Sequence, residues 1–148
     1  MLTLPRPAAA GWPALEKWRD LGWWEAQFGH RSVPLEVGSH TDGSWHEKVV
    51  SVSEFVASLR TGTEVVYCAQ HTLFTHLPAL CDDFDVPECV KGRVTRVNAW
   101  LGSSGTRTPL HFDSYDGAWV QRAKSATRKP ACIDVARRAC PRALPQAC

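Results

Sequence analysis

Two neighbouring blocks of sequence indicate the fold of this chain: Val97-Asn98-Ala99-Trp100-Leu101-Gly102 and Thr108-Pro109-Leu110-His111-Phe112-Asp113. The first block belongs to residues 93–101, where apolar and polar side chains alternate, a pattern typical of a half-buried strand. Residues 102–108 are rich in Gly, Ser and Thr and predict a turn. Residues 109–113 then enter another short strand, so the chain predicts two strands joined by a turn.

The triplet His111-Phe112-Asp113 is a candidate metal site. On an extended strand the two outer side chains point to the same face, because side chains alternate with period 2. An imidazole nitrogen and a carboxylate oxygen can then bind one side of a metal ion, and a second His completes the facial triad typical of non-haem Fe(II). A His-x-Asp triplet also occurs by chance as a solvated pair, so the triplet alone is weak evidence.

The remaining sequence predicts a mostly β domain with peripheral helices. The 148 residues suit one domain, and 44% hydrophobic and 22% charged residues suit a globular protein. Helices joined to strands by turns favour an antiparallel β-sandwich with the helices packed outside. The expected elements are a helix or two short helical turns at 12–29, with Pro13 in the first helical position, a strand at 32–37, a polar loop at 38–46, a helix at 51–60 capped by Ser51 or Ser53, a strand at 64–69, a short helix or turn at 72–80 broken at Pro78, and an acidic loop at 81–91.

Charge and composition divide the chain near residue 117. Residues 1–117 hold ten basic against fourteen acidic side chains (net −4), and residues 118–148 hold seven against one (net +6). The second segment, rich in Ala, Pro and Arg, shows no strand alternation and only a weak helical stretch near Ile133 to Ala139. Such a composition buries little surface, so we expect a disordered tail.

Several protein classes fit poorly. No apolar run approaches the roughly 20 residues that span a bilayer, and the N-terminus lacks the pattern of a signal peptide. The six cysteines are scattered without a C-x-x-C pair, which argues against a Cys-based zinc site and favours reduced thiols in the nucleus or cytoplasm. The basic tail lacks interleaved aromatic side chains, so we do not expect a nucleic-acid partner.

Taken in order, several blocks resemble the JmjC hydroxylases of the cupin superfamily, in particular the branch of JmjC-domain-containing protein 5. Beside the two opening blocks, they are Gly11-Trp12-Pro13-Ala14, Val33-Pro34-Leu35-Glu36-Val37-Gly38, Tyr67-Cys68-Ala69-Gln70-His71 with Leu73-Phe74, and Leu77-Pro78-Ala79-Leu80. The resemblance covers residues 1–117 and implies part of a double-stranded β-helix, or jelly roll.

The resemblance also implies a chemistry. Members of this family use Fe(II) and 2-oxoglutarate to hydroxylate C–H bonds, with arginyl, lysyl or methyl-lysyl side chains of proteins as usual substrates. By position, His111 and Asp113 match the first two iron ligands. Thr108 and Tyr67 match hydroxyl groups that hold the cosubstrate. Gln70, Asn98 and Trp100 match a polar contact and the lining of the substrate cleft.

Each of the supporting residues has an ordinary structural alternative. Tyr67 lies in an apolar strand and Trp100 in another, where aromatic rings usually serve packing. Gln70 and Asn98 are of the type that satisfies buried backbone groups. His71 and His76 match no ligand position, and we interpret them as structural.

The sequence departs from the family pattern after Asp113. No histidine follows His111, so the third iron ligand is missing, and Gly117 stands where the family has Asn. Lys124 lacks the Gly-x-Lys-Tyr surroundings of the family's cosubstrate lysine. We therefore expect a truncated or altered isoform, with a tail from another exon or reading frame and little activity. A non-catalytic fragment that binds partners, or that regulates a full-length relative, is the alternative.

Overall fold

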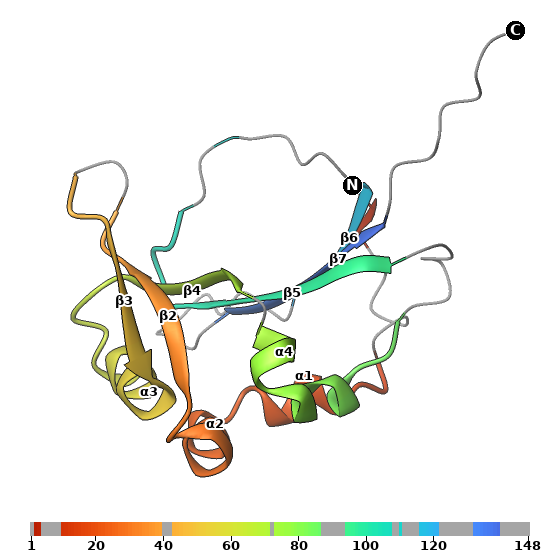
Figure 1. Ribbon diagram of the computed structural model, residues 1–148, viewed down its shortest axis with the longest axis horizontal. Helices are drawn as coiled ribbons and strands as arrows, with labels where there is room; N and C mark the ends of the chain where they lie inside the picture. Colours follow the sequence, from red (N-terminus) through yellow and green to blue (C-terminus); the bar gives the residue numbers. More distant parts are fainter. Residues whose placement is uncertain are drawn as a thin grey trace, which may run out of the picture.

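One sheet organises the part of the chain that the computed structural model describes, residues 2–3, 10–39, 43–71, 73–86, 94–107, 110, 116–121 and 132–139. Its strand order is β1-β6-β7-β5-β4-β2-β3, and every pairing is antiparallel except that of β1 with β6 (Figure 1). The strands are β1 (Leu2–Thr3), β2 (Ser32–Val37), β3 (His46–Ser51), β4 (Val66–His71), β5 (Val94–Gly102), β6 (Asp116–Gln121) and β7 (Cys132–Ala139).

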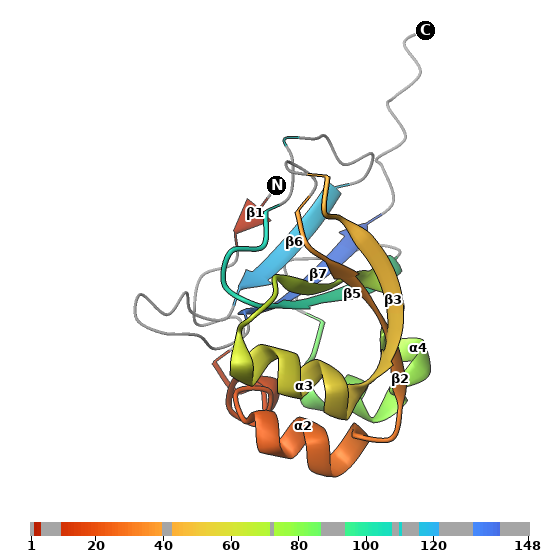
Figure 2. The ribbon, with the colours of Figure 1, turned by 90° about the vertical axis from the view of Figure 1, so that its left-hand side faces the viewer.

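The helices gather on one side of the strands β4 and β5, as the two ribbon views show (Figures 1 and 2). They are α1 (Ala14–Lys17), α2 (Leu21–Phe28), α3 (Val52–Thr61), α4 (Leu73–His76) and the 3-10 turn η2 (Pro78–Asp83). None of the helices described is long and apolar enough to span a bilayer.

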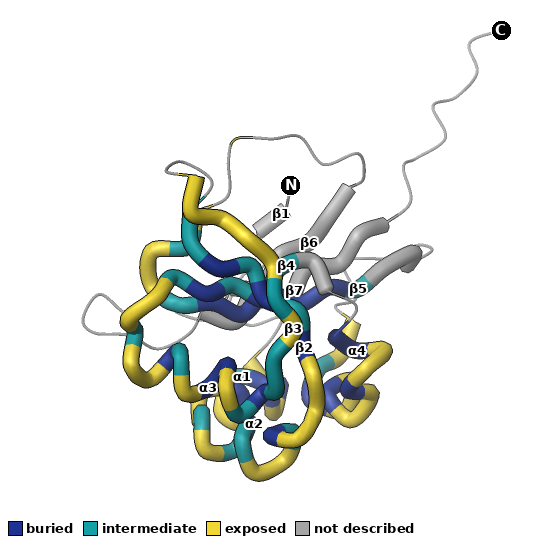
Figure 3. Tube along the Cα trace, turned by 60° about the vertical axis from the view of Figure 1, so that its left-hand side comes forward, coloured by how far each residue is buried: buried dark blue, intermediate teal, exposed yellow. Residues whose placement is uncertain are grey.

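The apolar core lies between these helices and the sheet. Alternate residues of β2 are buried in it, and α3 contributes a helical stripe (Figure 3). Its members include Val33, Leu35, Val37, Val52, Phe55, Val56, Leu59, Val66, Cys68, Ala99 and Leu101. Burying one face of the sheet fixes the register of each strand, because a slip of one residue would turn that face to solvent.

Most expected elements are present at their expected positions. The strands at 32–37 and 93–101 and the helix at 51–60 are confirmed, with Ser51 rather than Ser53 as the cap. Of the two alternatives for residues 12–29, one helix or two short helical turns, the structure has two helical segments, α1 and α2. The second begins where the Asp20 side chain accepts a hydrogen bond from the Gly22 amide (2.8 Å). The strand predicted at 109–113 lies outside the described residues, apart from Leu110.

Two elements correct the sequence prediction. β3 was not predicted: it starts at the last residue of the expected polar loop and covers residues 47–50, where three polar residues and two valines from residue 46 onward show no clean alternation. β7 is a strand where a weak helical stretch was expected, since it pairs along its length with both β5 and β6. Such pairing overrides weak helical propensity. The division of the chain at residue 117 stays a prediction.

A buried carboxylate links the first helix to the turn η2. Asp83 is 2% exposed and accepts hydrogen bonds from Lys17 Nζ (2.6 Å) and Trp18 Nε1 (2.8 Å). The Trp18 ring also packs near Phe74 and Phe84, with centroids 6.1 Å away in each case. Asp83 therefore binds two side chains, those of Lys17 and Trp18, that lie more than 60 positions earlier in the sequence. Its hydrogen bond to Trp18 orients the indole ring against Phe74 and Phe84.

We predict that Asp83→Ala lowers the free energy of unfolding by about 3 kcal/mol, because it leaves the Trp18 N–H buried without an acceptor and removes the partner of Lys17. Asp83→Asn keeps an acceptor and should cost less. Urea titration followed by tryptophan fluorescence measures both values. Equal losses for the two variants would contradict the role of the hydrogen bond.

Helix α3 begins with a reciprocal cap. Ser51 Oγ accepts from the Glu54 amide (3.2 Å), and Glu54 Oε2 accepts from the Ser51 amide (2.7 Å). These hydrogen bonds from Ser51 lower the pKa of Glu54. Gly62, with φ of 58°, ends the helix in the left-handed conformation.

We predict that this cap makes stability depend on pH. Since the pKa of Glu54 is lowered on folding, its stabilisation is complete above the pKa of the unfolded chain and is lost as pH falls through the folded value. Thermal melts of the natural chain and of Glu54→Gln, from neutral to acidic pH, should converge at low pH. A constant difference would contradict the prediction.

Candidate functional site

The two central strands carry different chemistry on their two faces. Val66 and Cys68 of β4, and Ala99 and Leu101 of β5, point into the helix-covered core. Because side chains alternate along a strand, the residues between them belong to the opposite face. This opposite face of β4 and β5 is the candidate site.

Three residues expected at a cosubstrate or substrate site share the candidate face. Tyr67 of β4 pairs with Gly102 of β5, and Trp100 and Asn98 precede Gly102 at intervals of two. Asn98 and Trp100 are 2% and 6% exposed, and Tyr67 is half-buried. Neither Asn98 nor Trp100 belongs to the apolar core cluster. The fold therefore brings residues from two separate sequence blocks onto one surface.

Asn98 is the polar group on this face that most needs a partner. Its Oδ1 atom is buried and accepts no hydrogen bond from the residues that the structure describes. An unpaired buried acceptor typically costs about 1–3 kcal/mol, so such atoms are rare in folded proteins unless a ligand or water completes them. The side-chain oxygen of Asn98 can therefore accept a hydrogen bond from an N–H or O–H group of a ligand.

Gly102 makes room for the ring of Tyr67. A Cβ atom at this position would lie 2.6 Å from Tyr67 Cδ2 and 2.9 Å from Thr106 Cγ2. Both distances are shorter than van der Waals contact allows. The absence of a side chain at Gly102 thus decides where the Tyr67 ring lies.

Cys68 lies next to Tyr67 on the strand but faces the core. Burial, with a smaller contribution from the charge of Glu36, raises the pKa of its thiol to about 12. The thiol therefore stays protonated at neutral pH and takes no part as a nucleophile or metal ligand.

Sequence analysis missed two residues on the same face. Glu36 of β2 pairs directly with Tyr67 of β4, and Trp45 Nε1 donates to Glu36 Oε2 (3.4 Å). The alternation of Val33, Leu35 and Val37 with Glu36 already indicates that this carboxylate faces away from the core. Glu36 lies beside Tyr67 because β2 pairs with β4, and this pairing cannot be read from the sequence.

The other expected site residues are not placed. Gln70 lies on β4 at an irregularity in its pairing with β5, between Cys68 and His71, and its side chain is outside the described set. Thr108, His111 and Asp113 also lie outside the described residues. Among the residues that are described, no three His, Cys, Asp or Glu side chains gather as metal ligands.

Residues 6–122 match the family described as a cupin-like domain. This match covers well over half of the chain. The chain belongs to the cupin-like domain family. Its jelly-roll architecture with peripheral helices, expected from the sequence, agrees with this membership and with the sheet of the structure.

Curated relatives carry JmjC or demethylase names. Jumonji C domain-containing protein 5 of Drosophila melanogaster is 36% identical over 116 residues, which cover 69% of this chain and 29% of that protein. Lysine-specific demethylase JMJ30 of Arabidopsis thaliana is 38% identical over 120 residues, 76% of this chain and 28% of that protein. Lysine-specific demethylase 8 of Danio rerio is 40% identical over 113 residues, again 69% and 28%. The resemblance to the JmjC branch is confirmed, and the chain spans less than a third of the length of these relatives.

We predict that Gly102→Ala disturbs the candidate face selectively. The added methyl group must displace the Tyr67 ring or the strand, at a cost of about 1–3 kcal/mol, as is typical of overpacking. Chemical denaturation measures the loss. Gly11→Ala is the matched control, since a Cβ atom there has nothing within 4 Å. Equal stability of the two variants would show that the face tolerates a larger residue.

Proposed function

We propose that this chain carries part of the active site of a JmjC-type oxygenase that uses Fe(II) and 2-oxoglutarate and acts on protein side chains. The observation that carries the proposal is the shared face of Tyr67, Asn98 and Trp100, with the unpaired Asn98 oxygen among them. Family membership gives this face its chemical context.

In this proposal His111 and Asp113 hold the iron. One imidazole and one carboxylate are the donor types of the facial triad that binds non-haem Fe(II). Iron and 2-oxoglutarate together supply the oxidising chemistry when bound. The buried acceptor of Asn98, unpaired among the described residues, supports the proposal because a polar ligand could pair with it.

The remaining candidate residues would bind and orient the cosubstrate 2-oxoglutarate. The hydroxyl groups of Tyr67 and Thr108 donate hydrogen bonds to a carboxylate of 2-oxoglutarate, and Gln70 provides a further polar contact. Such charge-assisted bonds contribute roughly 1.5–3 kcal/mol each. The donors would fix the carboxylate, since hydroxyl groups pair readily with oxyanions.

Asn98 and Trp100 form the substrate side. We assign the Trp100 ring, which is 6% exposed, to the lining of the substrate cleft. Asn98 Oδ1 accepts an N–H donor from the peptide or side chain of the substrate, so binding removes the cost of a buried unpaired acceptor. The substrate is thus a protein segment, consistent with the demethylase names of the relatives, and we place the protein in the nucleus or cytoplasm.

We further propose that the chain by itself turns over slowly. These 148 residues contain no histidine after His111 and no matched cosubstrate lysine, so they supply two iron ligands. The same observation favours a second function, that of a non-catalytic interaction partner or regulator of a full-length relative.

Binding of Co(II) as a spectroscopic substitute for Fe(II) tests the proposal. We expect weak binding that 2-oxoglutarate strengthens, that His111→Ala abolishes, and that the control variant His76→Ala retains, since His76 matches no ligand position. Visible absorption during metal titration gives the affinities. Equal binding by the two variants, or indifference to 2-oxoglutarate, would overturn the site.

Release of CO₂ from labelled 2-oxoglutarate tests the level of activity separately. We expect turnover close to that of His111→Ala under the same conditions. Vigorous CO₂ release that His111→Ala abolishes would show that the chain is a competent oxygenase and would contradict only the proposal of slow turnover.

A further inference from the structure

Strand β3 forms one end of the sheet. Within the described residues its six positions pair with β2 alone, so its other edge presents backbone N–H and C=O groups that no described strand uses. Figure 3 colours most of this strand exposed or intermediate. A free strand edge is a template for pairing with another extended chain.

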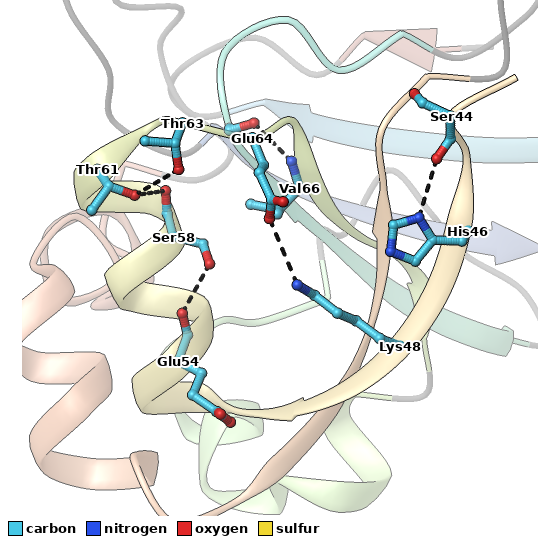
Figure 4. A network of polar contacts seen from close by, with 10 residues as sticks. Ser44, His46, Lys48, Glu54, Ser58, Thr61, Thr63, Glu64 and Val66 are labelled. Carbon is cyan, nitrogen blue, oxygen red and sulfur yellow. Dashed lines mark hydrogen bonds and ion pairs between the residues drawn. The ribbon is translucent and has the colours of Figure 1, made fainter. Parts of the chain in front are cut away.

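The inner face of β3 is already engaged. Lys48 Nζ lies 3.7 Å from Glu64 Oε2, and a contact of 3.1 Å joins His46 Nδ1 to the Ser44 carbonyl oxygen (Figure 4). These contacts hold the two side chains on the side of the sheet that faces α3.

The other face of β3 carries two exposed side chains without such contacts. Val49 is 73% exposed, so its apolar side chain faces solvent. Glu47, two positions earlier, is also exposed, and no ion pair or hydrogen bond joins its side chain to another described residue. Glu47 of β3 pairs directly with Glu36 of β2, so the two side chains lie on the same face of the sheet. Val49, two positions after Glu47, lies on that face as well.

The Glu36–Glu47 pair gives this face a charge preference. Directly opposed side chains on one face of an antiparallel pair lie about 5 Å apart, and like charges there are destabilising. A cation placed beside Glu47 on its open side would be attracted by the exposed Glu47 carboxylate. An apolar β-branched residue beside Val49 would cover the exposed valine.

We propose that β3 binds an extended basic peptide, which adds to the sheet as a further strand. The peptide has Arg or Lys opposite Glu47 and Val, Ile or Thr opposite Val49, a basic-x-apolar pattern with period 2. Backbone hydrogen bonds give the affinity, and the two side-chain positions give the choice of sequence.

A second copy of the chain is the other occupant that the edge can take. Antiparallel pairing of β3 with itself about Glu47 or Lys48 would place like charges opposite one another, which is unfavourable. Pairing about Val49 avoids both contacts, so the test below separates self-association from peptide binding. The proposal also does not depend on the oxygenase chemistry, because none of its residues is a candidate metal or cosubstrate ligand.

The test uses the full chain and two labelled synthetic peptides of alternating Thr and Val. One peptide has a single Arg in its centre and the other has Glu at the same position. Fluorescence anisotropy should show that the Arg peptide binds more tightly, by about threefold or more. Glu47→Lys, a change at an exposed position, should reverse the preference, and circular dichroism verifies that this variant folds.

Two further measurements locate the binding. An Arg peptide with N-methylated backbone amides should lose at least about tenfold in affinity, because it cannot donate the ladder hydrogen bonds. Hydrogen exchange should slow at the amides of β3 when the unmodified peptide binds. Val49→Thr, which keeps the β-branched shape, should weaken binding less than Val49→Asp.

Three outcomes would overturn the proposal. Equal binding of the methylated peptide would indicate charge attraction without strand addition. Failure of Glu47→Lys to change the preference would remove the assigned contact. Concentration-dependent self-association that protects the β3 amides would assign the edge to a second copy of the chain.

Discussion

The period-two alternation of β4 and β5 is the constraint on which the rest of the structure depends. Val66, Cys68, Ala99 and Leu101 must face the helices to bury their apolar surface. Once they do, Tyr67, Asn98 and Trp100 have to occupy the opposite face. The hydrophobic effect thus positions the polar candidate site indirectly, since a slip of one residue would expose the core and bury the site residues in it.

The helices stabilise this arrangement of the two faces because they pack against the apolar face of β4 and β5. Asp83 fixes Trp18 and Lys17, and the capping box begins α3 at Ser51. Neither feature touches the candidate face. They matter to it because a firmly packed helical layer keeps β4 and β5 in register, and register decides which side chains meet across the sheet.

Elements with strong local signals were predictable, and elements that depend on long-range pairing were not. The alternation of residues 32–37 and the helical stripe of 51–60 are visible in the sequence, and both elements are present. β3 shows no clean alternation because it ends the described sheet, and all of its residues are exposed or half-buried. β7 has no strand-like composition and exists through its pairing with β5 and β6. In the same way, the sequence indicated Tyr67, Asn98 and Trp100, whereas Glu36 entered the candidate face only through its pairing with Tyr67.

The sequence by itself determined the family, because the order of its blocks and the His-x-Asp triplet are properties of the chain. It also supplied two candidate donors, the imidazole of His111 and the carboxylate of Asp113, whose role as metal ligands stays a prediction. Only the tertiary structure decided that two distant blocks share a face, that the buried acceptor of Asn98 has no partner among the described residues, and that β3 ends the sheet as far as the structure describes it. The physical reason is that burial and strand pairing are sums over residues far apart in the chain, and neither quantity can be evaluated from any one segment.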